Sequence, residues 1–192
     1  MKLIRMNKVD GGKYLHRYEL VYENRLGKEK HYEIVSRREI ASPEELGKKS
    51  SGISMIVTMD HKLLLLKEFR MAINRSVYNL CAGMINPGET IEECAARELY
   101  EETGLTVKKI TKILPASYSA VAISDIMTNI VYVEAEGNIS NEHFSENEEI
   151  RAAFYSAKEI AAMLETEAFS SRSQLAAYQF CMSEQYHSSF RR

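Results

Sequence analysis

The sequence predicts an α+β fold in which a small N-terminal antiparallel β-sheet precedes a larger domain with a mixed sheet. Residues 18–36 contain two stretches in which apolar and polar residues alternate, the pattern of half-buried strands. Two apolar, strand-like runs follow between residues 53 and 70. The segment 91–103 instead repeats its apolar residues at helical spacing, so helices and strands both contribute to the fold.

Length and composition set the domain organisation. The chain has 192 residues, of which 45% are hydrophobic, enough to bury a sizeable core. It exceeds a typical single domain of about 100–150 residues by roughly one small extension. We therefore expect residues 1–48 to form an N-terminal β-hairpin region, and residues 49–192 to form the main domain.

Charge and cysteine usage narrow the class of protein. The formal net charge of −2 gives no reason to expect binding to nucleic acid or to an acidic membrane. No apolar run approaches the roughly 18 residues of a membrane span, and the first ten residues have no signal-peptide core. Cys81, Cys94 and Cys181 are odd in number and lack CxxC spacing, which indicates reduced thiols. We expect a cytoplasmic protein.

The remaining elements follow from hydrophobic periodicity. The strands at 18–23 and 31–36 flank a polar turn and form a β-hairpin, which needs something to pack on because two strands alone are marginally stable. The unbroken leucine run of 62–70 predicts a strand buried on both faces. Further strands are expected at 53–59, 105–114, 127–134 and 152–156, amphipathic helices at 156–164 and 171–182, and a frayed tail at 186–192.

The segment 91–103 has clear helix ends. Thr90 followed three residues later by Glu93 forms a capping box, and Gly104 stands in the usual C-terminal position. At about 100° per residue the inward stripe contains four residues: Ile91, Cys94, Ala95 and Leu99. The opposite side is expected to carry Glu92, Glu93, Ala96, Tyr100 and Thr103.

Three acids lie on this helix where the apolar pattern predicts leucine or valine. Glu98, Glu101 and Glu102 are spaced i, i+3 and i+4, so like charges face one another near the helix C-terminus, where the macrodipole also disfavours anions. A solvated acidic helix end is the alternative interpretation. A bound divalent cation removes both penalties, and oxygen ligands without imidazole or thiolate favour Mg²⁺ or Mn²⁺.

This segment resembles the Nudix box, G-x5-E-x7-R-E-U-x-E-E-x-G-U, where U is a bulky aliphatic residue. Every fixed position is met: Gly83, Glu89, Arg97, Glu98, Leu99, Glu101, Glu102, Gly104 and Leu105. The resemblance implies an α/β/α sandwich and hydrolysis of a nucleoside diphosphate linked to another moiety. It also implies metal ligation by Glu98, Glu101, Glu102 and the carbonyl of Ala82, with Arg97 holding a box glutamate in position.

In length and layout the chain resembles the ADP-ribose and nucleotide-sugar pyrophosphatase branch of that family. The resemblance implies a homodimer built through the N-terminal sheet, whereas an additional sheet on a monomer is the alternative. Glu68-Phe69-Arg70 resembles the Gln-Phe-Arg of this branch, so Arg70 is expected to bind a substrate phosphate. Asn79 stands where relatives use a glutamate to recognise the nucleoside, and it presents both a donor and an acceptor.

Two loops complete the expected site. Residues 115–125 lack the Ser-Pro-Gly and the glutamate found in ADP-ribose hydrolysing relatives, which leaves the base and sugar open; Tyr118 and Ser119 are candidate substrate contacts there. Residues 144–151 are similar to the Glu-Asn-Glu segment of ADP-ribose pyrophosphatases. By that resemblance Glu146 is the candidate general base, and Glu148 is an additional metal ligand or alternate base.

Together these features predict a Mg²⁺-dependent enzyme that hydrolyses the pyrophosphate of a nucleoside diphosphate sugar to a nucleoside monophosphate and a sugar phosphate. Arg97, Glu101, Glu146 and Glu148 are its expected catalytic residues. A nucleoside triphosphate sanitising pyrophosphatase is one alternative, although such relatives are generally shorter. A non-catalytic nucleotide-binding regulator is another, although such domains characteristically lose box glutamates, all of which are present here.

Overall fold

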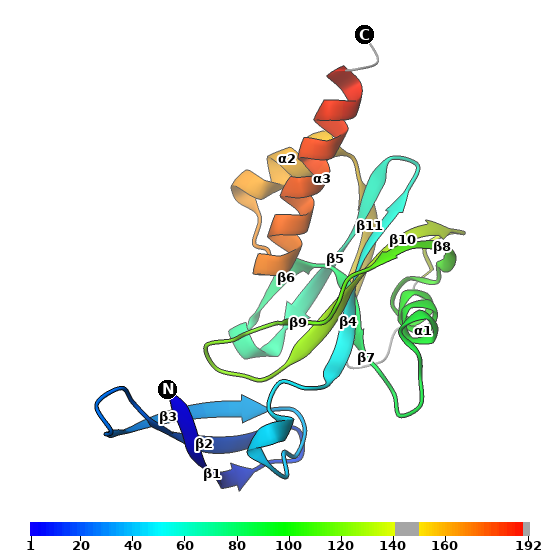
Figure 1. The fold of residues 1–192 in the computed structure, drawn as a ribbon. Coiled ribbons are helices and arrows are strands. Elements are labelled where there is room, and N and C mark those ends of the chain that lie inside the picture. The colour runs from blue at the N-terminus through cyan, green and yellow to red at the C-terminus, as the bar shows by residue number, and fades with distance from the viewer. Residues whose placement is uncertain (141–149, 190–192) are drawn as a thin grey trace. The chain divides into compact units, whose positions relative to one another are not determined.

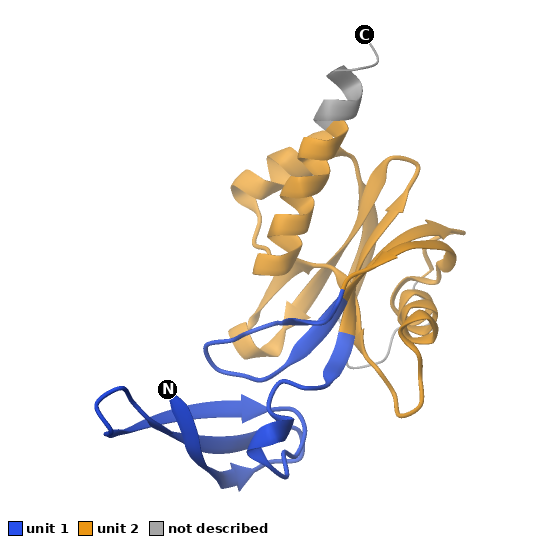
Figure 2. Cartoon of the chain, viewed as in Figure 1, with its two compact units in different colours: residues 1–52, 115–129 blue, residues 53–114, 130–192 orange. Residues whose placement is uncertain are grey.

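The computed structural model describes residues 1–140 and 150–189, and the chain divides into two compact units (Figure 2). Unit 1 contains residues 1–52 and 115–129. Unit 2 contains residues 53–114 and 130–192. The expected boundary at residues 48 and 49 remains a prediction, and the two units are described separately.

Unit 1 is built on a three-stranded antiparallel sheet in the order β1-β2-β3. Its strands are β1 (Lys2–Gly11), β2 (His16–Glu23) and β3 (Glu29–Ser36). The predicted hairpin is β2 and β3, whose register pairs His16 with Ser36 and Glu23 with Glu29. The sequence did not predict β1, because two register shifts, between Leu3 and Arg5 and between Lys8 and Asp10, interrupt the alternation that marks a strand.

The second segment of unit 1, residues 115–129, is attached to this sheet by backbone hydrogen bonds. The amide of Val35 on β3 donates to the carbonyl of Ile123 at 2.9 Å. Within the segment, β9 (Ser117–Tyr118) pairs with the first residues of β10 (Met127–Glu136). Residues 42–52 connect the two sheets; they contain the short helix η1 (Pro43–Glu45), and β4 already begins at Ser50.

The sheet of unit 2 has the order β11-β5-β4-β10-β8, with β6 paired to β5 and β7 to β4. Its further strands are β4 (Ser50–Met59), β5 (Lys62–Arg70), β6 (Arg75–Asn79), β7 (Cys81–Met84), β8 (Thr106–Ile113) and β11 (Ile150–Tyr155). The short helix η2 (Met71–Ile73) connects β5 to β6. Asp60 and His61 turn β4 into β5 with positive φ angles of 50° and 58°, the conformation of a two-residue hairpin turn.

Helix α1 covers one side of this sheet, and helices α2 and α3 cover the other (Figure 1). They are α1 (Ile91–Thr103), α2 (Ala157–Thr166) and α3 (Ser171–Ser189). Strand β5 supplies both cores by alternation: Leu64 and Leu66 join the core that contains Leu99 of α1, whereas Leu63 and Leu65 join the core of α2 and α3. Each buried leucine stabilises the fold by about 1.5–3 kcal/mol. The predicted α/β/α sandwich with its N-terminal sheet is confirmed.

Helix α1 begins and ends at the residues that the sequence predicts, but one residue, Thr103, lies on the opposite face from the one expected. The Glu93 amide donates to Thr90 Oγ1 at 3.2 Å, the Thr90 amide donates to Glu93 Oε2 at 2.8 Å, and Gly104 has a φ of 75°. Thr103, expected on the outer side, is fully buried. Its hydroxyl donates to the Leu99 carbonyl at 2.5 Å, which satisfies the polar group inside the core.

Three further observations concern the end of α3, the cysteines and the helices. The backbone of α3 continues to Ser189, so the expected frayed tail from residue 186 was wrong over those four residues. The three cysteines are buried free thiols, as expected. Within residues 1–140 and 150–189, no helix combines the length and apolar character needed to span a membrane.

Candidate active site

Glu98 of α1 lies directly over Gly83 of β7. A Cβ atom placed on Gly83 would stand 1.7 Å from the Glu98 Cδ atom, so only glycine leaves room for this carboxylate. The Glu98 side chain is 13% exposed. Burial raises its pKa above the usual value, while the hydrogen bond from Arg97 opposes that shift. The first glycine of the box is therefore explained by close packing against an acid of the same box.

Glu102 lies one helical turn further on and contacts the same strand. The backbone amide of Ala82 donates to Glu102 Oε2 at 3.2 Å. Burial raises the pKa of Glu102 to about 8, and the negative charges of Glu98 and Glu68 add to the effect, while hydrogen bonds from Cys81 and Ala82 oppose it. Glu98 and Glu102 thus lie together against β7. Repulsion between their carboxylates is costly there unless a cation is bound.

Glu101 differs from the other two acids of the predicted metal cluster. Its side chain is 54% exposed and accepts a 3.1 Å hydrogen bond from Arg97. In the part of the chain that the structure describes, no three acidic, histidine or cysteine side chains are arranged as ligands around one point. Glu98 and Glu102 are brought together, and Glu101 stays at the rim of the helix.

Arg97 connects the acids of the box. Its guanidinium donates to Glu89 through Nε at 2.7 Å and Nη2 at 2.9 Å, to Glu98 at 2.7 Å, and to the Met84 carbonyl at 2.9 Å. The paired bond to Glu89 is the main cause of the raised Arg97 pKa, and it lowers the pKa of Glu89 to about 2. The sequence analysis did not assign Glu89 a role, although its fixed place in the box was a signal for one.

The donor atoms on this side of the sheet fit a hard divalent cation. Glu98 and Glu102 offer carboxylate oxygens, which Mg²⁺ and Mn²⁺ prefer. Burial raises the pKa of both carboxyl groups and so disfavours their charged forms, which a bound cation would stabilise. Cys81 is a neutral neighbour of these acids, because burial raises the pKa of its thiol well above the ordinary range.

A second group of polar side chains lies where β5 ends beside β6. Glu68 forms an ion pair with Arg70, which is about half exposed, and accepts a 3.1 Å hydrogen bond from Asn79 Nδ2. The Asn79 Oδ1 atom accepts from Ser170 Oγ at 2.8 Å. The structure thus links two of the predicted substrate contacts, Arg70 and Asn79, through a residue that the sequence analysis assigned no role.

The remaining predicted site residues lie elsewhere. Tyr118 belongs to unit 1, where its exposed side chain donates a hydrogen bond to the Gly47 carbonyl at 3.2 Å. Ser119 is in the same segment and its hydroxyl lies 3.2 Å from that of Thr128. Glu146 and Glu148, the expected general base and additional ligand, lie outside the described residues.

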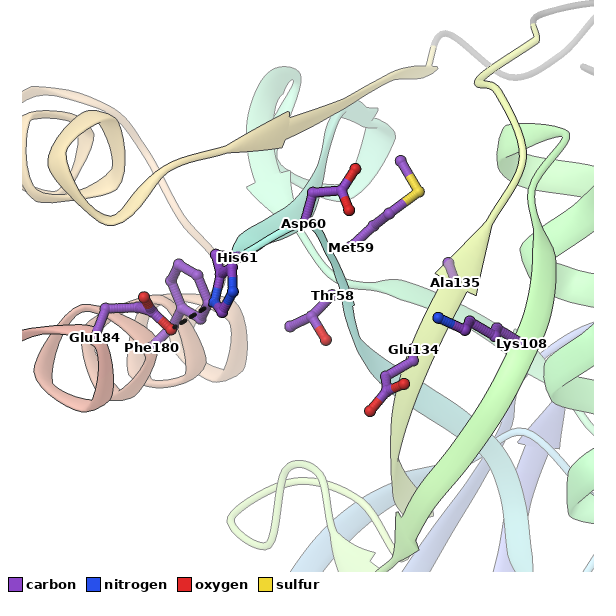
Figure 3. Close-up of a pocket in the computed structure, with 9 residues that line it drawn as sticks. All are labelled: Thr58, Met59, Asp60, His61, Lys108, Glu134, Ala135, Phe180 and Glu184. Atoms are coloured by element: carbon purple, nitrogen blue, oxygen red, sulfur yellow. Dashed lines mark ion pairs between the residues drawn. The ribbon is translucent and has the colours of Figure 1, made fainter. Parts of the chain in front are cut away.

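Unit 2 also contains a cavity of about 400 Å³ that none of the predicted site residues lines. Figure 3 shows that its side chains come from the β4–β5 turn, β8, β10 and α3. It contains an ion pair between His61 and Glu184, with 3.8 Å between Nδ1 and Oε1. Lys108, Asp60 and Glu134 add charges of both signs, so the lining selects no single class of charged ligand.

Comparison with known proteins supports the resemblance to the Nudix box. A family model described as NUDIX domain matches residues 48–178. An ADP-ribose pyrophosphatase of Bacillus subtilis is 36% identical over 95 residues, which are 49% of this chain and 51% of that protein. An NAD-capped RNA hydrolase NudC of Vibrio parahaemolyticus is 40% identical over 58 residues, 30% of this chain and 22% of its own length.

A solved structure of an ADP compounds hydrolase shares the fold over most of both molecules. Its TM-score to this chain is 0.75 with 18% sequence identity, and the match covers 97% of this chain and 95% of that one. At that identity the likeness concerns the fold. The model match covers most of the chain, and its matched residues include the whole glutamate-rich helix described above. The chain therefore belongs to the Nudix family.

Proposed function

We propose that this protein hydrolyses the pyrophosphate bond of a nucleoside diphosphate linked to a sugar, releasing a nucleoside monophosphate and a sugar phosphate. The observation that carries the proposal is the approach of Glu98 and Glu102 to Gly83 and Ala82, which places two partly buried acids against one short strand. Carboxylates in such an arrangement suit a cation that binds phosphate oxygens.

In this proposal Glu98 and Glu102 would hold Mg²⁺ or Mn²⁺, together with Glu101 and the carbonyl of Ala82. When bound, the ion neutralises charge on phosphate oxygens and lowers the pKa of bound water. Arg97 contributes by restraining the Glu98 carboxylate, which it contacts at 2.7 Å. A fixed ligand reduces the loss of conformational freedom on binding.

The rest of the reaction uses residues outside α1. Arg70 would bind a substrate phosphate through its guanidinium and so orient the bond to be broken. By resemblance to the family, Glu146 or Glu148 would accept the proton of the attacking water, with Glu148 as an additional ligand. Asn79 and Tyr118 remain proposed contacts to the nucleotide.

Two observations favour a nucleotide sugar over other substrates. The match to a B. subtilis protein named ADP-ribose pyrophosphatase extends over 95 residues, whereas the match to the NAD-capped RNA hydrolase covers 58 residues. The chain also has the N-terminal sheet that the sequence analysis associated with nucleotide-sugar hydrolases. ADP-ribose and other nucleoside diphosphate sugars are therefore the preferred candidates.

A substrate screen with Mg²⁺ tests the proposal. ADP-ribose, GDP-mannose, UDP-glucose, a dinucleotide and a nucleoside triphosphate are each incubated with the full chain, and the released monophosphate is quantified. We expect at least one nucleotide sugar to have the highest kcat/KM and chelation of the metal to abolish its hydrolysis. Release of pyrophosphate from a triphosphate at a higher kcat/KM than any sugar would contradict the proposed substrate class.

The same proposal includes a cytoplasmic homodimer formed through the N-terminal sheet. Strand β1 lies at one edge of the three-stranded sheet, where its backbone can pair with a second copy. Ile4 and Val9 of β1 are exposed apolar side chains, and covering them would remove apolar surface from water. Nucleic acid and membranes are not proposed as partners.

A further inference from the structure

Glu68 lies near the end of β5, where its carboxylate contacts two of the residues proposed to bind substrate, Arg70 and Asn79. Oε1 forms an ion pair with the guanidinium of Arg70, two residues further along the same strand. Oε2 accepts the hydrogen bond from Asn79 Nδ2 on the neighbouring strand β6 at 3.1 Å. The Glu68 side chain is only 20% exposed. Partial burial of a charge with two partners indicates a fixed position rather than a solvated one.

The contacts of Asn79 determine which end of its amide is available to a ligand. Its Oδ1 atom accepts from the Leu80 amide at 3.1 Å and from Ser170 Oγ at 2.8 Å. An amide oxygen has two lone pairs, so both are used. A carboxylate can only accept, so Glu68 requires the NH₂ group to face it, and the contacts of the described residues use one of its two hydrogens.

This arrangement changes the expectation drawn from sequence. Asn79 was expected to present a donor and an acceptor to the nucleotide. In the structure the acceptor is occupied by Leu80 and Ser170, so Asn79 can offer a ligand one N–H donor. The group is also close enough to the acidic helix for the charge of Glu68 to contribute to the raised pKa of Glu102.

We propose that Glu68 is a positioning residue that determines selectivity at the nucleoside end of the site. It holds the NH₂ group of Asn79 toward its own carboxylate, which leaves one N–H as a donor to a hydrogen-bond acceptor on the nucleoside, and it restrains Arg70. The inference rests on the proposed function, because it takes Arg70 and Asn79 as substrate contacts. A glutamine at position 68 has the same shape but can donate as well as accept, so it no longer requires one orientation of Asn79.

The test compares the full chain with its Glu68→Gln variant by isothermal titration calorimetry, using ADP and inorganic pyrophosphate as separate probes with Mg²⁺. We expect the variant to bind ADP at least about fivefold more weakly, the effect of one lost hydrogen bond. Pyrophosphate binding should be unchanged or tighter, because Arg70 loses a competing carboxylate. In an Asn79→Ala background, Glu68→Gln should not weaken ADP binding any further.

Glu167→Gln is the matched control, because it removes the ion pair to Lys67 on the same strand without touching Arg70 or Asn79. We expect it to leave the binding of both probes unchanged. Equal ADP affinity in Glu68→Gln and parent overturns the inference. So does equal weakening of ADP and pyrophosphate with a lowered Tm, which would indicate a structural role. A parent chain that neither binds ADP nor hydrolyses a nucleotide sugar overturns the proposed function and this inference together.

Discussion

Glu102 is the residue at which burial and charge conflict most strongly. It is a carboxylate with a pKa raised to about 8, it lies near Glu98, and it accepts a hydrogen bond from the backbone of Ala82. A core position with no ligand would be served better by an apolar side chain. A bound cation would offset the cost of burying this carboxylate.

Glu102→Gln should keep the fold and lower turnover by at least about a hundredfold, since a ligand oxygen is replaced while the shape is kept. Its Tm should stay equal or rise, because a buried acid is removed. Turnover is measured over a range of Mg²⁺ concentrations and the fold by circular dichroism. The exposed Glu92→Gln on the same helix serves as the control. Equal activity of variant and parent at every Mg²⁺ concentration would refute the metal assignment.

Glu89 gives a pH-dependent prediction for stability. Its hydrogen bonds from Arg97 and the Asn86 amide lower its pKa from the ordinary 4.5 to about 2. A carboxylate whose pKa is lowered by folding stabilises the folded state at pH values above its ordinary pKa. This stabilisation is lost as the pH falls toward 2. Glu89→Gln should therefore be less stable than the parent at pH 7, with the difference shrinking between about pH 4.5 and 2.

Urea unfolding midpoints of the two proteins between pH 7 and pH 2 measure this difference. A difference that stays constant over the whole range would mean that Glu89 acts through its shape rather than its charge.

At the scale of helices and strands, the sequence predicts those features that depend on residues close together in the chain. The capping box of α1 and the two-sided burial of β5 each follow from residues adjacent in sequence, and both were observed. Strand β1 was missed because its two register shifts remove the period-2 pattern. Strands β6 and β7, with lengths of 5 and 4 residues, are too short to show that pattern.

The candidate site likewise has one part that the sequence predicts and one part that it does not. The acids of α1 could be found from spacing on a single helix. The Arg70–Glu68–Asn79 group could not, because β5 and β6 are brought together by pairing of Phe69 with Ser76 and Leu66 with Asn79. Nor could the role of Ser170, which is 91 residues from Asn79 in the chain.

The capping box provides a prediction at this scale. Thr90→Ala removes the acceptor of the Glu93 amide and should destabilise the protein by about 1 kcal/mol. Ser156→Ala removes the equivalent cap of α2, whose Glu159 amide lies 3.4 Å from Ser156 Oγ. Urea unfolding should show similar losses for both variants. Turnover should fall only for Thr90→Ala, because only α1 carries the acids of the site; an equal loss of turnover in Ser156→Ala would contradict this.

At the scale of the molecule, residues 115–129 depend on the N-terminal sheet within unit 1. Val35 donates to the Ile123 carbonyl at 2.9 Å, Tyr32 donates to the Ala122 carbonyl, and Arg38 pairs with Asp125 at 3.4 Å. Deleting residues 1–45 removes all three partners and should give an aggregating or inactive product. A truncated chain that is active and monomeric by light scattering would disprove this dependence and the proposed dimer.

The dimer can be tested separately from folding with substitutions of exposed apolar residues of β1. Ile4→Glu and Val9→Glu each replace an exposed apolar side chain, which the proposed contact would bury, by a charged one. We therefore expect the mass measured by light scattering to fall from twice the 22.0 kDa of one chain to that of one chain. Leu175→Glu, on an exposed apolar position of α3, should leave the dimer intact. Circular dichroism should be the same for all three variants. A parent protein with the mass of one chain, or dimers that persist in both β1 variants, would exclude assembly through this sheet.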